Sequence, residues 1–245
     1  MSCEKCGGSG WIILEREGIS GAQPCGCVPG ADPQDLEDAA RIPPHYRASS
    51  FDSFNAFNDA YQAILVKLVY YVREFPMGLK KPGLMFIGAT GTGKTHLAVA
   101  VLRKLIGKGF QGLFFDYMNL LERIRAGWND LANAADRDAY QSCLDADVLL
   151  LDDVGSHRMS DFVEDTVTGI VTYRCNHEKP LIVTTNIPDP DADFNMIKRS
   201  ASGATEYQKT SLAERIGYRA RSRLFEMCEV IRMPETGDYR LRKGR

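Results

Sequence analysis

Short apolar runs alternate with helix-forming segments along most of the chain. Five runs are rich in aliphatic and aromatic residues, which is typical of strands buried on both faces. They span residues 84–87, 113–117, 148–151, 181–184 and 230–233. Helices are predicted to begin near Lys94, Tyr117, Asp136, Asp161 and Leu212. The alternation predicts an α/β fold with a parallel five-stranded sheet, helices on both faces and a ligand at the carboxyl ends of the strands.

Two segments outside this alternation have patterns of their own. Residues 59–75 carry apolar residues at helical spacing, which predicts a helix with one buried face. The residues on that face are Ile64, Leu65, Leu68, Val69 and Val72. Residues 188–210 contain two prolines among polar and charged residues, which predicts a long loop.

The first thirty residues differ from the rest of the chain. They are rich in Cys and Gly and lack aliphatic periodicity, so they cannot build an ordinary hydrophobic core. Residues 31–41 favour a helix, which Pro43 and Pro44 would end. We therefore expect a small N-terminal module with a linker helix, residues 1–41, and a main domain, residues 42–245.

The bulk composition limits the class of protein. Hydrophobic residues make up 44% and charged residues 25% of the 245, close to the averages for soluble proteins. The longest apolar runs are far shorter than the roughly 20 residues of a membrane span, and the chain does not begin with a secretory signal. We expect a cytoplasmic protein without a membrane partner. A net charge of -2 argues against wholesale binding to nucleic acid.

The most specific motif is a phosphate-binding loop, or P-loop, with the pattern G-x-x-x-x-G-K-[ST]. It consists of Gly88, Ala89, Thr90, Gly91, Thr92, Gly93, Lys94 and Thr95, and lies between a predicted strand and a predicted helix. Backbone N–H groups of such a loop converge on phosphate oxygens, and the helix adds its positive dipole end. Lys94 would bridge the β- and γ-phosphates of ATP, and the Thr95 hydroxyl would bind Mg²⁺. We assign the next residue, His96, to this nucleotide site rather than to a metal.

Polar groups follow two more of the predicted strands. Asp152 and Asp153 end the run 148–151, where Asp152 would orient Mg²⁺ and Asp153 would polarise the attacking water. Asn186 ends the run 181–184 and could contact the γ-phosphate or that water. The alternatives are that the two acids cap the next helix and that Asn186 only starts a turn.

Four cysteines form two close pairs in the N-terminal module. Cys3 and Cys6 are separated from Cys25 and Cys27 by a Gly-rich segment, and two such pairs suit a tetrahedral Zn²⁺ site. Metal binding would then supply the folding free energy that the module lacks. An iron–sulfur centre or free thiols are the alternatives.

These motifs, in this order, resemble the AAA+ ATPases of the DnaC and IstB kind over residues 42–245. The double acid at the strand end and the segment Ile42-Pro43-Pro44-His45-Tyr46-Arg47, which borders the adenine in that family, carry part of the resemblance. The arginine-rich segment 214–224 carries the rest. The resemblance implies that Arg223 reaches the γ-phosphate of a neighbouring subunit, with Arg219 as the next candidate. It also implies an AAA+ core without a C-terminal lid. A solvated basic helix face is the alternative for the two arginines.

The resemblance also implies a function and partners. The chain looks like a helicase loader of the DnaC or DnaI type, which would assemble in an ATP-dependent manner on single-stranded DNA or on the replicative DNA helicase during DNA replication. A transposition helper like IstB, acting on double-stranded DNA, is one alternative. A switch that binds ATP with negligible turnover is another.

Overall fold

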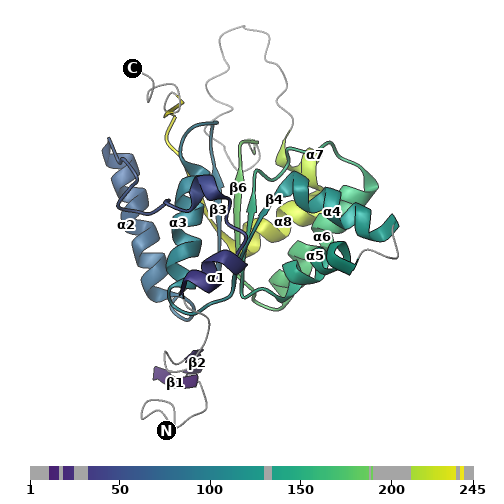
Figure 1. The fold of residues 1–245 in the computed structure, drawn as a ribbon. Coiled ribbons are helices and arrows are strands. Elements are labelled where there is room, and N and C mark those ends of the chain that lie inside the picture. Colours follow the sequence, from purple (N-terminus) through teal and green to yellow (C-terminus); the bar gives the residue numbers. More distant parts are fainter. Residues whose placement is uncertain are drawn as a thin grey trace, which may run out of the picture.

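A five-stranded parallel sheet organises the computed structural model, which describes residues 11–16, 19–24, 33–129, 134–187, 189, 211–235 and 238–239. The strands are β3 (Gly83–Ile87), β4 (Gly112–Asp116), β5 (Val148–Asp152), β6 (Leu181–Thr185) and β7 (Cys228–Arg232). Their order across the sheet is β4-β5-β6-β3-β7 (Figure 1). The predicted parallel sheet is therefore confirmed, and each strand lies within two residues of its predicted position.

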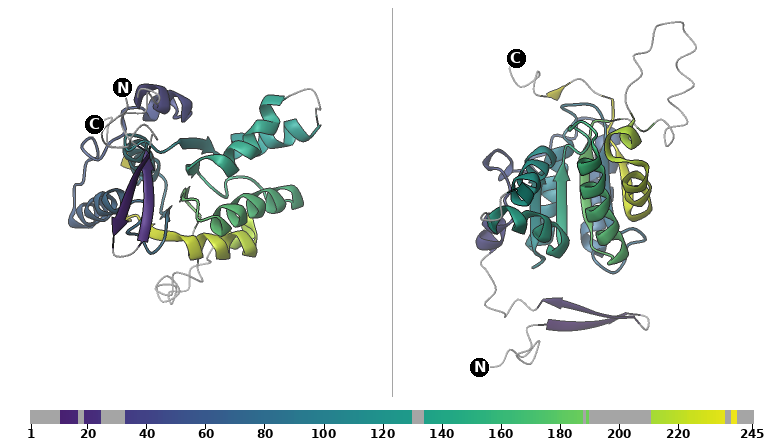
Figure 2. Two further views of the ribbon diagram at one scale, coloured as in Figure 1. Left: turned by 90° about the horizontal axis from the view of Figure 1, so that it is seen from below. Right: turned by 90° about the vertical axis from the view of Figure 1, so that its right-hand side faces the viewer.

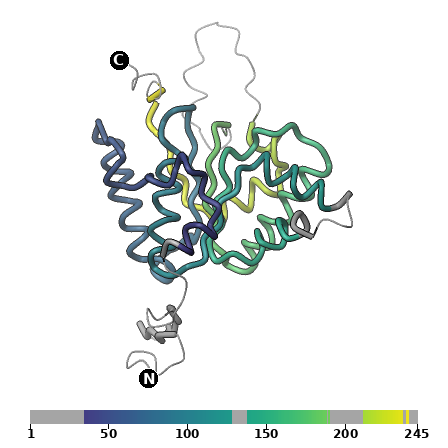
Figure 3. The backbone as a smooth tube through the Cα atoms, viewed as in Figure 1, coloured from purple at the N-terminus to yellow at the C-terminus, as the bar shows by residue number. Residues whose placement is uncertain are grey.

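Helices cover both faces of this sheet. One set consists of α1 (Pro33–Ala39), α2 (Asp59–Glu74) and α3 (Lys94–Ile106). The other consists of α4 (Tyr117–Asn129), α5 (Ala134–Asp145), α6 (Asp161–Asn176), α7 (Leu212–Ile216) and α8 (Tyr218–Met227). Figures 1 and 2 show the two sets on opposite sides of the strands, and Figure 3 traces the crossing of the chain between them after β4.

Side chains of each central strand alternate between two hydrophobic cores. Leu84 and Phe86 of β3 pack with α2 and α3, whereas Met85 and Ile87 pack with the second set of helices. Every residue of β3, β5 and β6 is buried, as predicted for strands inside a parallel sheet. The carboxyl ends of these strands are thereby fixed along one edge.

Two predicted helices differ in detail from the observed ones. In α2 the buried residues include Tyr61 and Tyr71, while Val69 is exposed, so the predicted apolar face was wrong at that position. The hydroxyl groups of both tyrosines donate to main-chain carbonyls, which makes their burial possible. The helix expected from Leu212 is divided at Gly217, whose φ of 86° ends α7 before α8 begins.

A buried arginine braces the edge opposite the strand ends. The guanidinium of Arg174 in α6 donates to the carbonyl oxygens of Cys143, Ala146, Asp147 and Pro180, over 2.6–3.2 Å. These carbonyls lie just before β5 and β6, so the Arg174 side chain links the segments that lead into the two strands. Burial lowers the pKa of Arg174 to about 10.

The N-terminal part contains an antiparallel hairpin of β1 (Trp11–Arg16) and β2 (Ile19–Pro24). Cys3, Cys6, Cys25 and Cys27 lie outside the described residues, so the zinc site stays a prediction. The expected linker helix is α1, and it packs against α3 and β4. The Ala40 carbonyl after it accepts from the N–H of Phe114. None of the described helices is both long and apolar enough to cross a membrane.

Candidate nucleotide-binding site

A cavity of about 700 Å³ lies where β3, β5 and β6 end. Most of its lining comes from the P-loop, the strand ends and the segment 45–57 that precedes α2, and Tyr61 and Tyr239 complete it. The structure thus brings together the predicted residues 90–96, Asp152, Asp153 and Asn186 in one pocket. A parallel sheet favours this position for a ligand because its strand ends and helix N-termini meet there.

The P-loop has the conformation that its glycines predict. Gly91 and Gly93 have φ angles of 77° and 88°, in the left-handed region that favours glycine. Helix α3 begins at Lys94, so its first N–H groups open towards the loop. Lys94 is 8% exposed, and its ammonium donates to the carbonyl oxygens of Gly88 and Ala89, at 2.9 and 2.8 Å. An anion held by these N–H groups would lie beside this ammonium.

Thr184 of β6 links the two acids at the end of β5. Its hydroxyl donates to Asp152 Oδ1 at 2.6 Å and accepts from the N–H of Asp153 at 2.9 Å. Burial raises the pKa of Asp152, although the hydroxyls of Thr184 and Thr95 oppose the shift. Sequence reasoning missed Thr184, although it ends a buried strand with a hydroxyl two residues before Asn186.

Asp153 lines the same pocket as the P-loop lysine. Burial raises its pKa and the charge of Lys94 lowers it, while the charge of Asp116 raises it further. Asp153 has a φ of 57°, which few non-glycine residues adopt. A half-buried carboxylate in this position can accept a proton or orient a water molecule.

Asp116 is a third carboxylate in the pocket, and it was not predicted. It ends β4 directly opposite Asp152 in the strand register. Its Oδ1 accepts from the N–H of Asn119, so it also caps α4. The signal was available, because an apolar run ending in an acid had already identified Asp152.

The segment before α2 forms an aromatic wall of the pocket. The Phe54 ring packs against Tyr61 and His96, and a Cβ added to Gly93 would lie 2.6 Å from it. His96 Nε2 contacts the Ser50 carbonyl oxygen at 2.9 Å. His96 of α3 therefore links the segment before α2 to that helix. Sequence reasoning did not predict this role.

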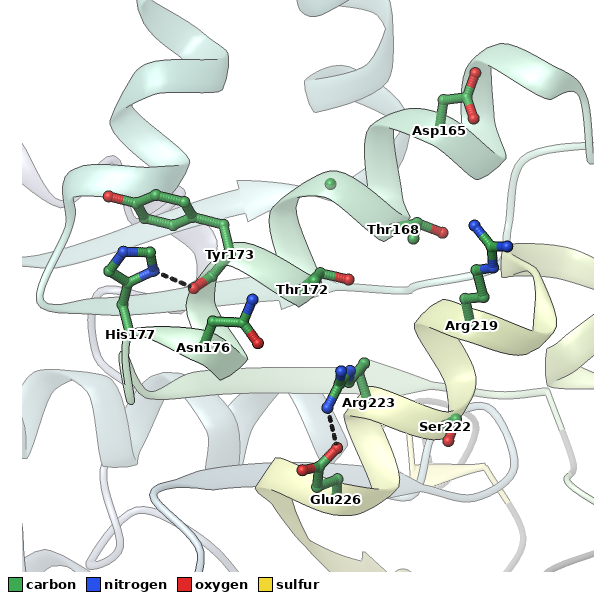
Figure 4. A pocket seen from close by; sticks show the side chains of 11 residues that line it. Asp165, Thr168, Thr172, Tyr173, Asn176, His177, Arg219, Ser222, Arg223 and Glu226 are labelled. Atoms are coloured by element: carbon green, nitrogen blue, oxygen red, sulfur yellow. Dashed lines mark hydrogen bonds and ion pairs between the residues drawn. The ribbon is translucent and has the colours of Figure 1, made fainter.

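The predicted arginines lie elsewhere. Arg219 and Arg223 line a separate groove of about 850 Å³ between α6 and α8. Figure 4 shows both side chains on α8, on the side that faces α6. Arg223 Nη1 is 2.7 Å from Glu226 Oε2, in an exposed ion pair. Within one chain, neither arginine is part of the nucleotide pocket.

The donor set of the pocket fits Mg²⁺ bound with a nucleotide. The Thr95 hydroxyl and the Asp152 carboxylate line the same pocket, and both are hard oxygen ligands. Among the described residues, no group of three or more His, Cys, Asp and Glu side chains could hold a metal ion alone. Mg²⁺ is usually bound by one or two carboxylates together with the phosphate oxygens of a nucleotide.

The fold and this pocket define the class as a P-loop nucleotide-binding protein with an AAA+ core. The model of the family described as IstB-like ATP binding protein matches residues 34–194. The chain belongs to that family, as a DnaC/IstB-like AAA+ ATPase.

Individual relatives are more distant. The replicative helicase loader DnaC of Escherichia coli is 23% identical over 145 residues, which cover 59% of this chain and 58% of DnaC. The chain thus spans little more than half the length of the curated relatives that it matches. A crystal structure of the DnaC helicase loader is 32% identical, with a TM-score of 0.64, and covers 78% of this chain and all of that one. The structure of DnaI, at 20% identity and a TM-score of 0.61, covers 79% of this chain and 95% of that one and agrees in fold.

Proposed function

We propose that the chain is a Mg²⁺-dependent ATPase that assembles with ATP and loads a replicative helicase on single-stranded DNA. The P-loop N–H groups and Lys94 bind the phosphates, while Thr95 and Asp152 hold Mg²⁺. When bound, Mg²⁺ neutralises charge on the phosphate oxygens. Asp153 orients and deprotonates the attacking water, with Asn186 beside it.

The observation that carries the ATPase proposal is the Thr184 bridge between the two acids. One hydroxyl fixes the carboxylate of Asp152 and the backbone of Asp153 together. Asp153 in turn lies close enough to Lys94 for its pKa to respond to that charge. These contacts support the proposal, because the acid proposed to bind the metal and the acid proposed to orient water are linked before the nucleotide binds.

Arg223 is proposed to act on the nucleotide of a neighbouring subunit. It is exposed, and its ion pair with Glu226 is a surface pair of the kind that contributes little to stability. Arg223 is therefore available to a second chain. Hydrolysis would then depend on self-association, because each chain offers a nucleotide pocket at one place and an arginine at another.

The assignment to helicase loading is supported by the relatives named as helicase loaders. The N-terminal module is proposed to bind zinc through Cys3, Cys6, Cys25 and Cys27. The hairpin favours this proposal, because it pairs Trp11 with Pro24 and the two cysteine pairs flank those residues in the sequence. A transposition helper on double-stranded DNA remains the alternative, because the matching family is named after IstB.

The ATPase proposal is tested by turnover as a function of protein concentration. The parent chain should hydrolyse ATP with Mg²⁺ at a rate per chain that rises with concentration. Lys94→Ala should lose ATP binding, whereas Asp153→Asn should bind ATP and not hydrolyse it. Full helicase loading by Asp153→Asn would identify a nucleotide switch instead of an enzyme that needs turnover.

The partner proposal is tested by capture of the replicative helicase with and without ATP. Capture should require the intact cysteine pairs, so Cys3→Ser combined with Cys6→Ser should abolish it. Cys143→Ser, a change at a buried cysteine of the main domain, is the matched control. Intact capture of a transposase with no capture of the helicase would favour the alternative.

A further inference from the structure

A nearly buried ion pair joins the segment after β6 to helix α8. Arg221 Nε is 2.5 Å from Asp189 Oδ2, and Arg221 Nη2 is 2.7 Å from Asp189 Oδ1. The Asp189 side chain is 2% exposed and that of Arg221 is 21% exposed. The guanidinium also lies 5.0 Å from the centre of the Phe225 ring. A bidentate ion pair of this kind fixes the orientation of the guanidinium relative to the carboxylate as well as their distance.

The two partners belong to segments with different tasks. Asp189 follows Asn186, which lines the nucleotide pocket, by only three residues. Arg221 lies on α8 midway between Arg219 and Arg223, which line the groove beside α6 (Figure 4). Residues two apart on a helix point to different sides, whereas residues four apart share a side. One side of α8 is therefore tied to the pocket-lining segment, and another carries the two arginines.

We propose that Asp189 and Arg221 are a positioning pair that sets the place of Arg223 according to the nucleotide state of the same chain. Separating the charges of Asp189 and Arg221 is costly because the pair is nearly buried. A shift at the end of β6 that moves Asp189 should therefore move Arg221 and helix α8 with it. A nucleotide that contacts Asn186 would thereby move the arginine offered to the next subunit. Because this role rests on the proposed action of Arg223 on a neighbour, its test must separate the two.

Mixtures of inactive variants make that separation. The acceptor is Arg223→Ala, which binds ATP but offers no arginine. The donor is Lys94→Ala, which offers Arg223 but binds no ATP. Neither should hydrolyse ATP alone, whereas the mixture should be active because donor arginines complete acceptor sites. An active parent with an inactive mixture would overturn the neighbour role of Arg223 and this inference with it; an inactive parent would overturn the proposed ATPase itself.

Asp189→Asn is then placed in one partner at a time. In the donor it should reduce the activity of the mixture by about tenfold or more, because Arg223 is misplaced. In the acceptor, whose own arginine is absent, it should leave activity unchanged. Equal losses in both positions, or no loss in the donor, would overturn the inference. Arg221→Lys, which keeps the charge and loses the bidentate contact, replaces Asp189→Asn if that chain does not fold.

A second donor tests the dependence on nucleotide state. Asp153→Asn is expected to bind ATP without hydrolysing it, so it presents Arg223 from an occupied chain. It should activate the acceptor to a different degree from the Lys94→Ala donor. Adding Asp189→Asn to both donors should make their activities equal, whereas a difference that survives would show that the ion pair carries no signal. Tyr218→Phe, a change at an exposed residue of α8 outside the pair, is the control and should preserve the difference.

Discussion

Replacing Thr184 by Val should weaken the fold and the magnesium site together. Val has nearly the same shape, so no cavity forms and only the hydroxyl is lost. The hydroxyl donates to Asp152 at 2.6 Å and accepts from the Asp153 N–H at 2.9 Å. A hydrogen bond to a charged group contributes about 1.5–3 kcal/mol, and an unpaired buried N–H costs about 1–3 kcal/mol. Because Asp153 is half-buried, we expect a loss of about 2–5 kcal/mol in the free energy of unfolding at neutral pH.

The pH dependence of this loss follows from Asp152. Burial already raises the pKa of Asp152, and the Thr184 bond opposes that rise. An acid with a raised pKa in the folded chain contributes stability that is complete below its unfolded value, about 3.9, and is lost as the pH rises through the folded pKa. Removing the bond raises the folded pKa further. The deficit of the variant should therefore be larger at pH 7 than near pH 4.

Urea unfolding at several pH values measures this deficit, and Thr185→Val is the matched control. The buried Thr185 hydroxyl donates to the Val154 carbonyl oxygen at 2.7 Å and accepts from the N–H of Ile187 at 3.1 Å, so neither of these hydrogen bonds involves Asp152 or Asp153. Its loss should cost about 1–3 kcal/mol with no pH dependence. Identical pH profiles for the two variants would refute the reasoning. In turnover, Thr184→Val should also require more Mg²⁺ for half-maximal rate, whereas Thr185→Val should not.

Three further predictions concern other parts of the structure. Arg174→Met should cost about 2 kcal/mol or more in urea unfolding, because four carbonyl oxygens lose the guanidinium donor and two of these hydrogen bonds are buried. A cost below about 1 kcal/mol would contradict that role. Gly93→Ala should abolish binding of a fluorescent ATP analogue, because φ is 88° and the added Cβ would lie 2.6 Å from the Phe54 ring. Gly107→Ala, whose Cβ would have its nearest contact at 3.5 Å, should bind the analogue normally. Asp116→Asn should shift the acidic limb of the rate profile to lower pH, because it removes a charge that raises the pKa of Asp153; an unshifted limb would argue against Asp153 as the base.

The sequence was sufficient to predict an element wherever its local residue pattern matches its buried position in the fold. Each strand inside the sheet is a continuous apolar run, and the P-loop combines a fixed spacing with a required backbone conformation. Helix α2 shows the limit of periodicity. Tyr61 and Tyr71 are buried because main-chain carbonyls accept their hydroxyl protons, while the aliphatic Val69 stays in solvent. A periodicity read from hydrophobicity alone does not include such acceptors.

Pairings between distant segments were beyond sequence reasoning. Arg174 can be buried because the segments before β5 and β6 direct carbonyl oxygens towards its guanidinium. Arg221 belongs to the same arginine-rich segment as Arg219 and Arg223, yet it lies against Asp189 while the other two line a groove. Position around a helix separates these arginines, but the partner of each depends on how the sheet and helices pack.

The charges of the pocket favour a nucleotide that arrives with a divalent cation. Asp116, Asp152 and Asp153 meet there, and among its described lining residues Lys94 is the only lysine or arginine. Asp153 and Asp116 each raise the pKa of Asp152, so the ionised acids repel one another as well as lose hydration. A bare triphosphate would add to this repulsion, whereas a Mg²⁺ complex would reduce it. We therefore expect the arrangement that destabilises the acids also to favour the proposed magnesium complex over the free nucleotide.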